Sequence, residues 1–373
     1  MHGAAVVFAA LSVLLGAKEP SQTRQSAGSF LQIAKQAAQA REAGRLADAI
    51  RLYSDGVRLR PAWDEGWWSL GTLYYDEDRF EEARRALARF VQLAENPAPA
   101  LGLLALCEYE TREYDLAVGH FTEWAAKKPP ASNELLTVAY FHWALLLIRK
   151  GEFERATVLL NARARLGNSG PELEEAMGLA ALRMARLPEE YPPEEREPVW
   201  LAGRAAMQTA LQRPERADQE ARMLLRHYDA HPNVHYFLGT VLLDSHQSDA
   251  AAKQFERERQ ISPRHAAAMV QLAMFHLGNG EAAQALELAR KAADIEPGNF
   301  PAHKTMGDAL LQLERYADGT RELEIARNLA PESAAVHFSL ARAYQQMGRD
   351  ADAARERALF TKLKERERER TSK

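Results

Sequence analysis

Three histidines stand four residues apart in the second half of the chain, at His227, His231 and His235. On an unbroken helix this spacing would place the three rings on one side, where their nitrogens could bind a metal ion such as Zn²⁺. A metal-dependent enzyme would be the corresponding function. Pro232 lies between the second and third histidine, however, and a proline at that point ends a helix. We therefore expect the three histidines to lie on both sides of a turn, exposed or hydrogen-bonded, and to bind no metal ion.

The rest of the sequence shows no motif that is typical of an active site. The acidic pairs at 189–190 and 194–195 suit a solvated segment better than general acid catalysis. Gly278-Asn279-Gly280 fits a turn between two helices rather than a phosphate-binding loop, and neither Gly-x-Ser-x-Gly nor His-Glu-x-x-His occurs. We expect a protein that is not an enzyme and that uses no cofactor.

Charge and cysteine content narrow the function classes further. The net charge is −4 and 27% of the residues are charged, with both signs mixed, so no basic surface indicates binding of nucleic acid. The single cysteine, Cys107, cannot close a disulfide within the chain. Its position among apolar residues predicts a small, buried side chain.

The stretch 67–97 shows which elements would position a binding surface. Trp67, Leu70, Gly71 and Tyr74 recur every three or four positions, which predicts one face of a helix. A polar break at 76–78 follows, and the spacing of the next apolar residues predicts a second helix that begins near residue 80. Such a hairpin of two helices buries too little apolar surface to be stable alone.

The same pattern returns at a fixed interval. Alanines stand 34 residues apart at Ala49, Ala83 and Ala117, and prolines do so at Pro263, Pro297 and Pro331. A helix-turn-helix unit of 34 residues, with Trp, Leu, Gly, Tyr, Ala, Phe and Pro in this order, resembles the tetratricopeptide repeat family over roughly residues 30 to 365. The resemblance implies an all-α fold, a right-handed α-solenoid of antiparallel helix hairpins, with about nine hairpins and one half-repeat.

The two ends of the chain differ from the repeats. Residues 4–17 form an uncharged apolar run that ends in small residues, which predicts a signal peptide over 1–17 and export to the periplasm or the extracellular space. A retained N-terminal membrane anchor is the alternative, and no membrane span is expected in the mature chain. A polar spacer is expected over 18–29, and a charged tail that extends the last helix over 366–373.

The repeats themselves fall into two predicted arrays, 30–187 and 199–365, with a capping helix at the end of the second. About five extra residues near 130–133 are expected to interrupt the first array. Residues 188–198 contain four prolines and several glutamates, which predicts an extended, acidic surface segment. We expect this segment to act as a hinge or spacer, or else as a docking surface of its own.

The resemblance also implies where a partner would bind. In the tetratricopeptide repeat family the first helix of each hairpin lines a concave groove, and the lining residues are the fifth, ninth and twelfth of each unit. The matching positions in this chain are mainly aromatic and aliphatic, which is typical of a surface that binds a peptide or a helix. The predicted groove residues are Trp68, Thr72, Tyr75, Tyr109, Phe141, Leu145, Tyr236, Thr240, Met274, Lys304, Phe338 and Arg342.

Two further expectations concern these residues. Packing between neighbouring repeats would bury some of them instead of presenting them to a partner. Members of the family that bind chaperones hold a C-terminal carboxylate with lysines and asparagines at fixed groove positions, and here only Lys304 is a matching lysine. A carboxylate clamp is therefore not expected.

The sequence thus predicts a non-catalytic scaffold or adaptor that binds a protein or peptide partner in an apolar concave groove. A spacer or accessory subunit of a cell-envelope assembly or secretion complex is the alternative. The identity of the partner and the oligomeric state are left open.

Overall fold

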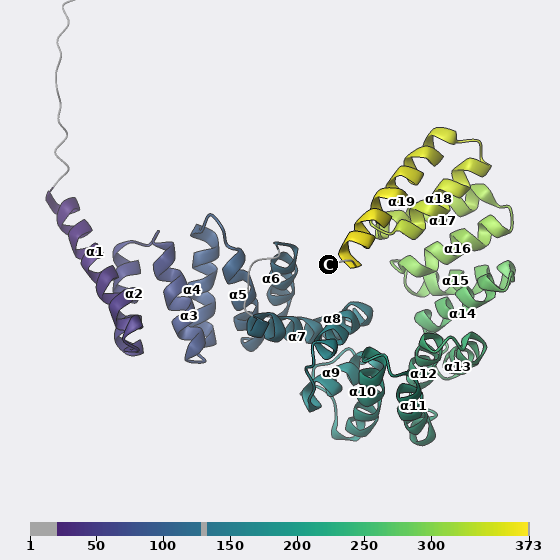
Figure 1. Cartoon of the computed structure of the whole chain (residues 1–373), viewed down its shortest axis with the longest axis horizontal. Helices are drawn as coiled ribbons and strands as arrows, with labels where there is room; N and C mark the ends of the chain where they lie inside the picture. The colour runs from purple at the N-terminus through teal and green to yellow at the C-terminus, as the bar shows by residue number, and fades with distance from the viewer. Residues whose placement is uncertain (1–20, 128–132, 372–373) are drawn as a thin grey trace, which may run out of the picture. The chain divides into compact units, whose positions relative to one another are not determined.

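A computed structural model of the chain describes residues 21–127 and 133–371. Within these ranges the regular elements are helices and no strand occurs, which confirms the predicted all-α fold (Figure 1). None of the described helices is both long enough and apolar enough to cross a membrane. The predicted signal peptide at 1–17 and the extra residues at 130–132 lie outside the described residues.

The chain divides into two compact units, Met1–Trp143 and Ala144–Lys373. The first unit consists of helix hairpins in chain order, and α7 begins in it and ends in the second unit. The helices of this part are α1 (Ser21–Glu42), α2 (Leu46–Leu59), α3 (Asp64–Asp76), α4 (Phe80–Leu93), α5 (Ala98–Glu110), α6 (Tyr114–Lys127) and α7 (Asn133–Arg149).

The second unit continues the same alternation of helices. Its described part contains α8 (Phe153–Arg165), α9 (Pro171–Ala181), the short 3₁₀ helix η1 (Pro193–Glu195), α10 (Arg196–Ala210), α11 (Pro214–Tyr228), α12 (Val234–Asp244), α13 (Ser248–Ile261), α14 (Ala266–Gly278), α15 (Ala282–Ile295), α16 (Phe300–Gln312), α17 (Tyr316–Leu329), α18 (Ala334–Gln346) and α19 (Asp350–Thr371). Nineteen α-helices in the described residues agree with the predicted nine hairpins and one half-repeat.

Small residues allow the two helices of a hairpin to approach closely, and Gly71 of α3 is one of them. A Cβ atom added to Gly71 would lie 2.6 Å from the side chain of Leu87 in the partner helix. Likewise, a Cβ atom added to Gly307 of α16 would lie 2.5 Å from the side chain of Leu323 of α17. The periodic alanines Ala49, Ala83 and Ala117 are fully buried. Because a larger side chain has no room at these positions, they determine how the hairpins pack.

The turn inside each hairpin repeats a single backbone device. A residue in the left-handed conformation ends the first helix, for example Gly44, Asp78 and Gly348 with φ of 67°, 56° and 68°. The next residue donates its N–H to the carbonyl five positions back, as Arg79 does to Tyr74 at 2.9 Å. This is the Schellman arrangement, which satisfies a carbonyl at the end of the helix and reverses the chain.

The half-repeat is α9, which ends like a first helix at Arg183, with φ of 51°. Residues 184–192 contain no helix, so α10 takes the place beside α9 that a second helix would occupy. A Cβ atom on Gly178 of α9 would lie 1.9 Å from the carbonyl oxygen of Val199, and one on Gly203 of α10 would lie 1.9 Å from that of Glu174. The two helices therefore pack backbone against backbone.

The segment 188–198 differs from its prediction as an extended surface spacer. Its prolines do keep 188–192 out of a helix, but Pro193 and Pro198 lie in the first turns of η1 and α10, where a missing N–H has little cost. Tyr191 is only 6% exposed and its hydroxyl donates to Glu175 of α9. The segment is thus packed against the half-repeat, and the division between the two units lies in α7 instead.

The N-terminal end carries more helix than expected, whereas the C-terminal end agrees with its prediction. The predicted spacer at 18–29 is helical from Ser21 onward, because α1 begins there, while 18–20 lie outside the described residues. At the other end α19 runs through the charged residues to Thr371, as the predicted extension of the last helix. Ala353 and Leu363 of α19 are buried, so one face of this capping helix packs inward.

Candidate functional site

The three spaced histidines lie around a turn, as predicted. His227 is exposed in the last turn of α11, His231 lies in the turn, and His235 lies in α12 with 4% of its surface exposed. Nε2 of His231 is 2.8 Å from Oε2 of Glu195, and Nδ1 of His235 is 2.7 Å from Oε1 of Gln254. In the described part of the chain no group of histidine, cysteine, aspartate and glutamate side chains converges on a point where a metal ion would bind.

A second set of histidines, which the sequence did not single out, has a structural role. Nε2 of His303 is 3.0 Å from the carbonyl oxygen of Pro297, and its Nδ1 is 2.8 Å from Oε2 of Glu322. His337, 34 residues later, repeats both contacts with Pro331 and Glu356. Each histidine connects the loop before its hairpin to the second helix of that hairpin. The available signal was the 34-residue spacing of the two histidines.

The first-unit residues of the predicted groove are half-buried and contribute to packing between helices. Trp68 packs on Phe90 with ring centroids 5.4 Å apart, and Tyr75 meets Phe80 edge to face at 5.8 Å. Burial is also the main reason why the pKa of Tyr75 is raised. The hydroxyl of Thr72 donates to the carbonyl of Ser69.

Tyr109 and Phe141 are the remaining predicted groove residues of the first unit. Their ring centroids lie 4.6 and 5.6 Å, respectively, from that of His142. Both are half-buried. Leu145, in the second unit, is only 3% exposed. The prediction that Leu145 lines a binding surface is corrected, because its side chain belongs to the hydrophobic core.

The six remaining predicted residues line three cavities of the second unit. The first, here called the half-repeat pocket, has a volume of about 300 Å³ and includes Tyr236 and Thr240. The second, the central cavity, has about 1370 Å³ and includes Tyr236, Met274 and Lys304. The third, the C-terminal cavity, has about 580 Å³ and includes Lys304, Phe338 and Arg342. Neighbouring cavities share lining residues and therefore adjoin one another, and the three together are here called the second-unit groove.

This groove exposes large apolar side chains among charges that are mostly paired. Met274 is 50% exposed and Phe338 is 49% exposed. Nζ of Lys304 lies 2.6 Å from Oδ2 of Asp308. The guanidinium of Arg342 lies 5.9 Å from the ring centroid of Phe338. The groove therefore offers apolar contact area with little net charge.

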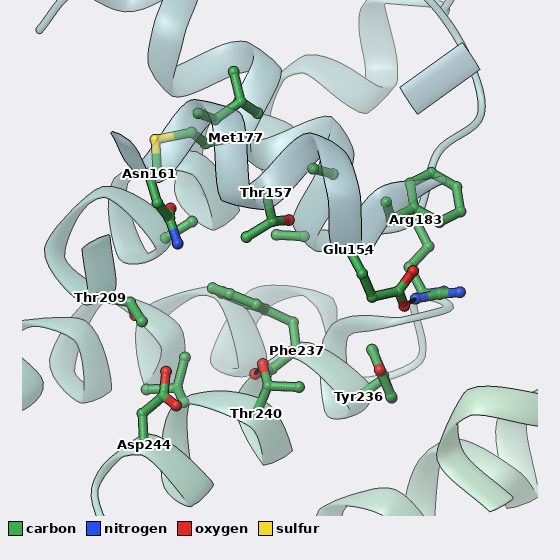
Figure 2. Close-up of a pocket in the computed structure, with 16 residues that line it drawn as sticks. Glu154, Thr157, Asn161, Met177, Arg183, Thr209, Tyr236, Phe237, Thr240 and Asp244 are labelled. Atoms are coloured by element: carbon green, nitrogen blue, oxygen red, sulfur yellow. Dashed lines mark hydrogen bonds and ion pairs between the residues drawn. The ribbon is translucent and has the colours of Figure 1, made fainter. Parts of the chain in front are cut away.

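The half-repeat pocket opens at the junction with the central cavity. There Arg183 forms an ion pair with Glu154 of α8 at 2.5 Å, and its guanidinium lies over the rings of Phe153 and Tyr236. Tyr236 is 8% exposed, and burial is the main reason why its pKa is raised. Figure 2 shows this group on one side of the pocket.

The opposite side of the half-repeat pocket holds Asp244 at the end of α12 and Thr209 near the end of α10 (Figure 2). The ring of Phe237 lies between the two sides. Partial loss of surrounding water raises the pKa of Asp244. Sequence reasoning missed Glu154, Arg183 and Asp244, because they do not occupy the repeat positions from which the groove was predicted.

Comparisons with known proteins agree with the repeat architecture. Four segments of the chain, 35–98, 69–132, 236–300 and 304–358, match the family described as Tetratricopeptide repeat. A stretch of 126 residues is 28% identical to anaphase-promoting complex subunit 3 of Schizosaccharomyces pombe, and it covers 34% of this chain and 18% of that protein. The chain thus spans less than a fifth of that relative.

Solved structures of MamA are similar over about half of the chain. MamA 41-end from Desulfovibrio magneticus RS-1 has 21% identity and a TM-score of 0.41, covering 46% of this chain and 96% of that one. The MamA RS-1 ArsTM double mutant has 20% identity and a TM-score of 0.41, and the match covers 48% of this chain and 98% of that one. The four matched segments include more than half of the residues, and their helix hairpins, turns and periodic small residues are those described above. The chain belongs to the tetratricopeptide repeat family, whose architecture is that of a protein-interaction scaffold.

Proposed function

We propose that the protein is a non-catalytic scaffold or adaptor that binds a peptide or helical segment of another protein in the second-unit groove. The supporting observation is the exposure of Met274 and Phe338, two large apolar side chains that line two adjoining cavities of this groove. Exposed apolar side chains that gather in a groove are typical of interaction sites, whereas single ones on a convex surface are ordinary.

The energy of binding would come mainly from burial of these apolar side chains. Complete burial of one large apolar side chain contributes about 1.5–3 kcal/mol. The groove is built on packed helices, so little conformational entropy is lost when a partner binds. The Lys304–Asp308 and Arg183–Glu154 ion pairs leave few charges without a partner, so the groove does not require a strongly charged segment.

The test compares two double variants of the full chain. Met274→Ala with Phe338→Ala removes apolar area from the groove. Ile325→Ala with Leu329→Ala removes exposed side chains of similar size from α17, which line none of the three cavities. The tagged proteins are cross-linked in the native host and the captured proteins are quantified by mass spectrometry, with circular dichroism as a control for folding.

The proposal expects one dominant partner that is lost, by about tenfold or more, only with the groove variant. Equal capture by both variants would contradict binding in the groove. A broad set of envelope proteins that is insensitive to both variants would instead support a spacer or accessory subunit of an envelope assembly.

We also propose that the chain is exported. The support is the apolar run at 4–17, which lies outside the described residues, and the polar stretch that follows it in the sequence. Retention of this run as a membrane anchor is the alternative.

A further inference from the structure

The half-repeat pocket lies where α9 is followed by a non-helical segment and α10 instead of a regular hairpin turn, and residues of α8, α9, α10 and α12 line it. Residues of α8, including Thr157 and Asn161, face residues of α12 across the pocket (Figure 2). With a volume of about 300 Å³, the pocket is at the lower limit for ligand sites and suits a single long side chain rather than a helix.

Three polar groups on the Asp244 side of this pocket can accept hydrogen bonds, and the amide of Asn161 beside them can both donate and accept. Oγ1 of Thr209 donates its proton to the carbonyl of Ala205 at 3.2 Å, and Oγ1 of Thr240 donates to that of Phe237 at 2.7 Å. Because each hydroxyl has only one proton, both present lone pairs to any ligand. The Asp244 carboxylate adds two further acceptor oxygens.

The same side of the pocket also has a negative charge without an ion-pair partner, although the nearby His246 interacts with it electrostatically. Asp244 is exposed and forms no ion pair or hydrogen bond with any residue that the structure describes. It is the last residue of α12, and Thr209 is next to the last residue of α10, so the negative ends of two helix dipoles lie here. Arg165 and Arg213 line the adjoining surface with Asp244, but Arg165 donates to the carbonyl of Ala210 instead.

The middle of the pocket is apolar. Phe237 and Val241 of α12 and Met177 of α9 line it, and all three are buried. At the other side Arg183 is already paired with Glu154. An apolar channel that ends in acceptors and an unpaired carboxylate is complementary to a long side chain with a cationic, donor-rich end.

We propose that the half-repeat pocket binds an arginine side chain of the partner segment. The methylene groups lie against Phe237 and Met177, and the guanidinium donates to Asp244, Thr209 and Thr240. Arginine fits better than lysine because its planar guanidinium has five donors and is more weakly hydrated than an ammonium group. This inference rests on the proposed function, since it names one recognition element of the segment that the groove binds.

The experiment uses the full chain labelled with ¹³C in the methionine methyl groups, with Nα-acetyl-arginine amide as the probe. Met177→Leu assigns the Met177 signal among the nine methionines of the chain. We expect the arginine probe to shift the Met177 signal in a saturable titration in the millimolar range. Nα-acetyl-citrulline amide, which has the same shape without the charge, should bind at least about fivefold more weakly.

Two aspartate variants provide the matched control. Asp244→Asn should weaken binding of the arginine probe at least about fivefold, because it removes the negative charge at this end of the pocket. Asp249→Asn changes an exposed aspartate in the first turn of α13 that does not line the pocket, and it should leave the titration unchanged. The citrulline comparison uses the unmodified protein, so it does not depend on the folding of any variant.

Equal shifts with citrulline and arginine, full retention of the arginine effect in Asp244→Asn, or no shift of Met177 would each overturn the proposal. Such a result would leave the proposed function in place if Met274→Ala with Phe338→Ala still abolishes partner capture. If partner capture is insensitive to that double variant, the proposed function fails whatever the arginine probe does.

Discussion

Nδ1 of His120 lies 2.7 Å from Oε2 of Glu108, and this contact joins α6 to α5 within the first unit. The Glu108 side chain is only 3% exposed, whereas that of His120 is 27% exposed. A carboxylate this deeply buried requires a partner that carries a proton. The relationship makes the stability of this hairpin sensitive to pH near neutrality.

The hydrogen bond to Glu108 raises the pKa of His120, although burial opposes the shift. A histidine whose pKa is raised in the folded state stabilises the fold below its ordinary pKa of about 6.5, and this contribution is lost as the pH rises through the raised value. We therefore expect the free energy of unfolding of the first unit to fall between pH 6 and 8. In an NMR titration, Glu108→Gln should lower the pKa of His120. An unchanged titration midpoint in that variant would contradict the role of the contact.

The close approach of α9 and α10 predicts a strong effect of Gly178→Ala. The added Cβ would lie 1.9 Å from the backbone carbonyl of Val199, so one of the two helices must move. We expect a loss of about 2–3 kcal/mol or more in stability, as for other overpacked interiors. Gly278→Ala, in the same unit with open space around the new Cβ, is the control and should have little effect. Urea unfolding of both variants measures the difference, and equal midpoints would show that the helices separate easily.

His337 should be a stabilising residue rather than a binding residue. Its ring lies between Glu356 of α19 and the carbonyl of Pro331, and only 3% of its side chain is exposed. His337→Ala leaves the buried Glu356 carboxylate with Arg327 as its remaining partner, at 3.0 Å. We expect a loss of roughly 2–4 kcal/mol in urea unfolding. His227→Ala, at an exposed position, should change stability by less than about 0.5 kcal/mol. Partner capture by the folded fraction of His337→Ala should be unaffected.

Export predicts a defined N-terminus. If residues 1–17 are removed as a signal peptide, N-terminal sequencing of the protein from its native host should begin at Lys18, and the protein should be released with the periplasmic or extracellular fraction. Retention of the apolar run would leave the full chain in the membrane fraction. Recovery of the full chain in the cytosol would contradict both forms of the proposal.

The local features of the fold follow from the sequence. Apolar and small residues with a helical spacing determine which face of each helix is buried, and the periodic alanines Ala49, Ala83 and Ala117 are fully buried. The turns are less evident, because the left-handed position between two helices accepts Asp78 as well as Gly44. The backbone hydrogen bonds of the turn, rather than the identity of one residue, determine that conformation.

The tertiary structure decided which residues remain accessible. Leu145 and Met274 belong to the same predicted stripe, yet one is 3% exposed and the other 50%. Helical spacing shows which residues share a face, but only the neighbouring helices determine whether that face is covered. The non-helical segment after α9 packs Tyr191 against α9, and α8, α9, α10 and α12 enclose the half-repeat pocket, where Asp244 lies in the same cavity as Arg183. Such contacts join residues far apart in the chain, so their formation depends on packing and not on the local pattern of the sequence.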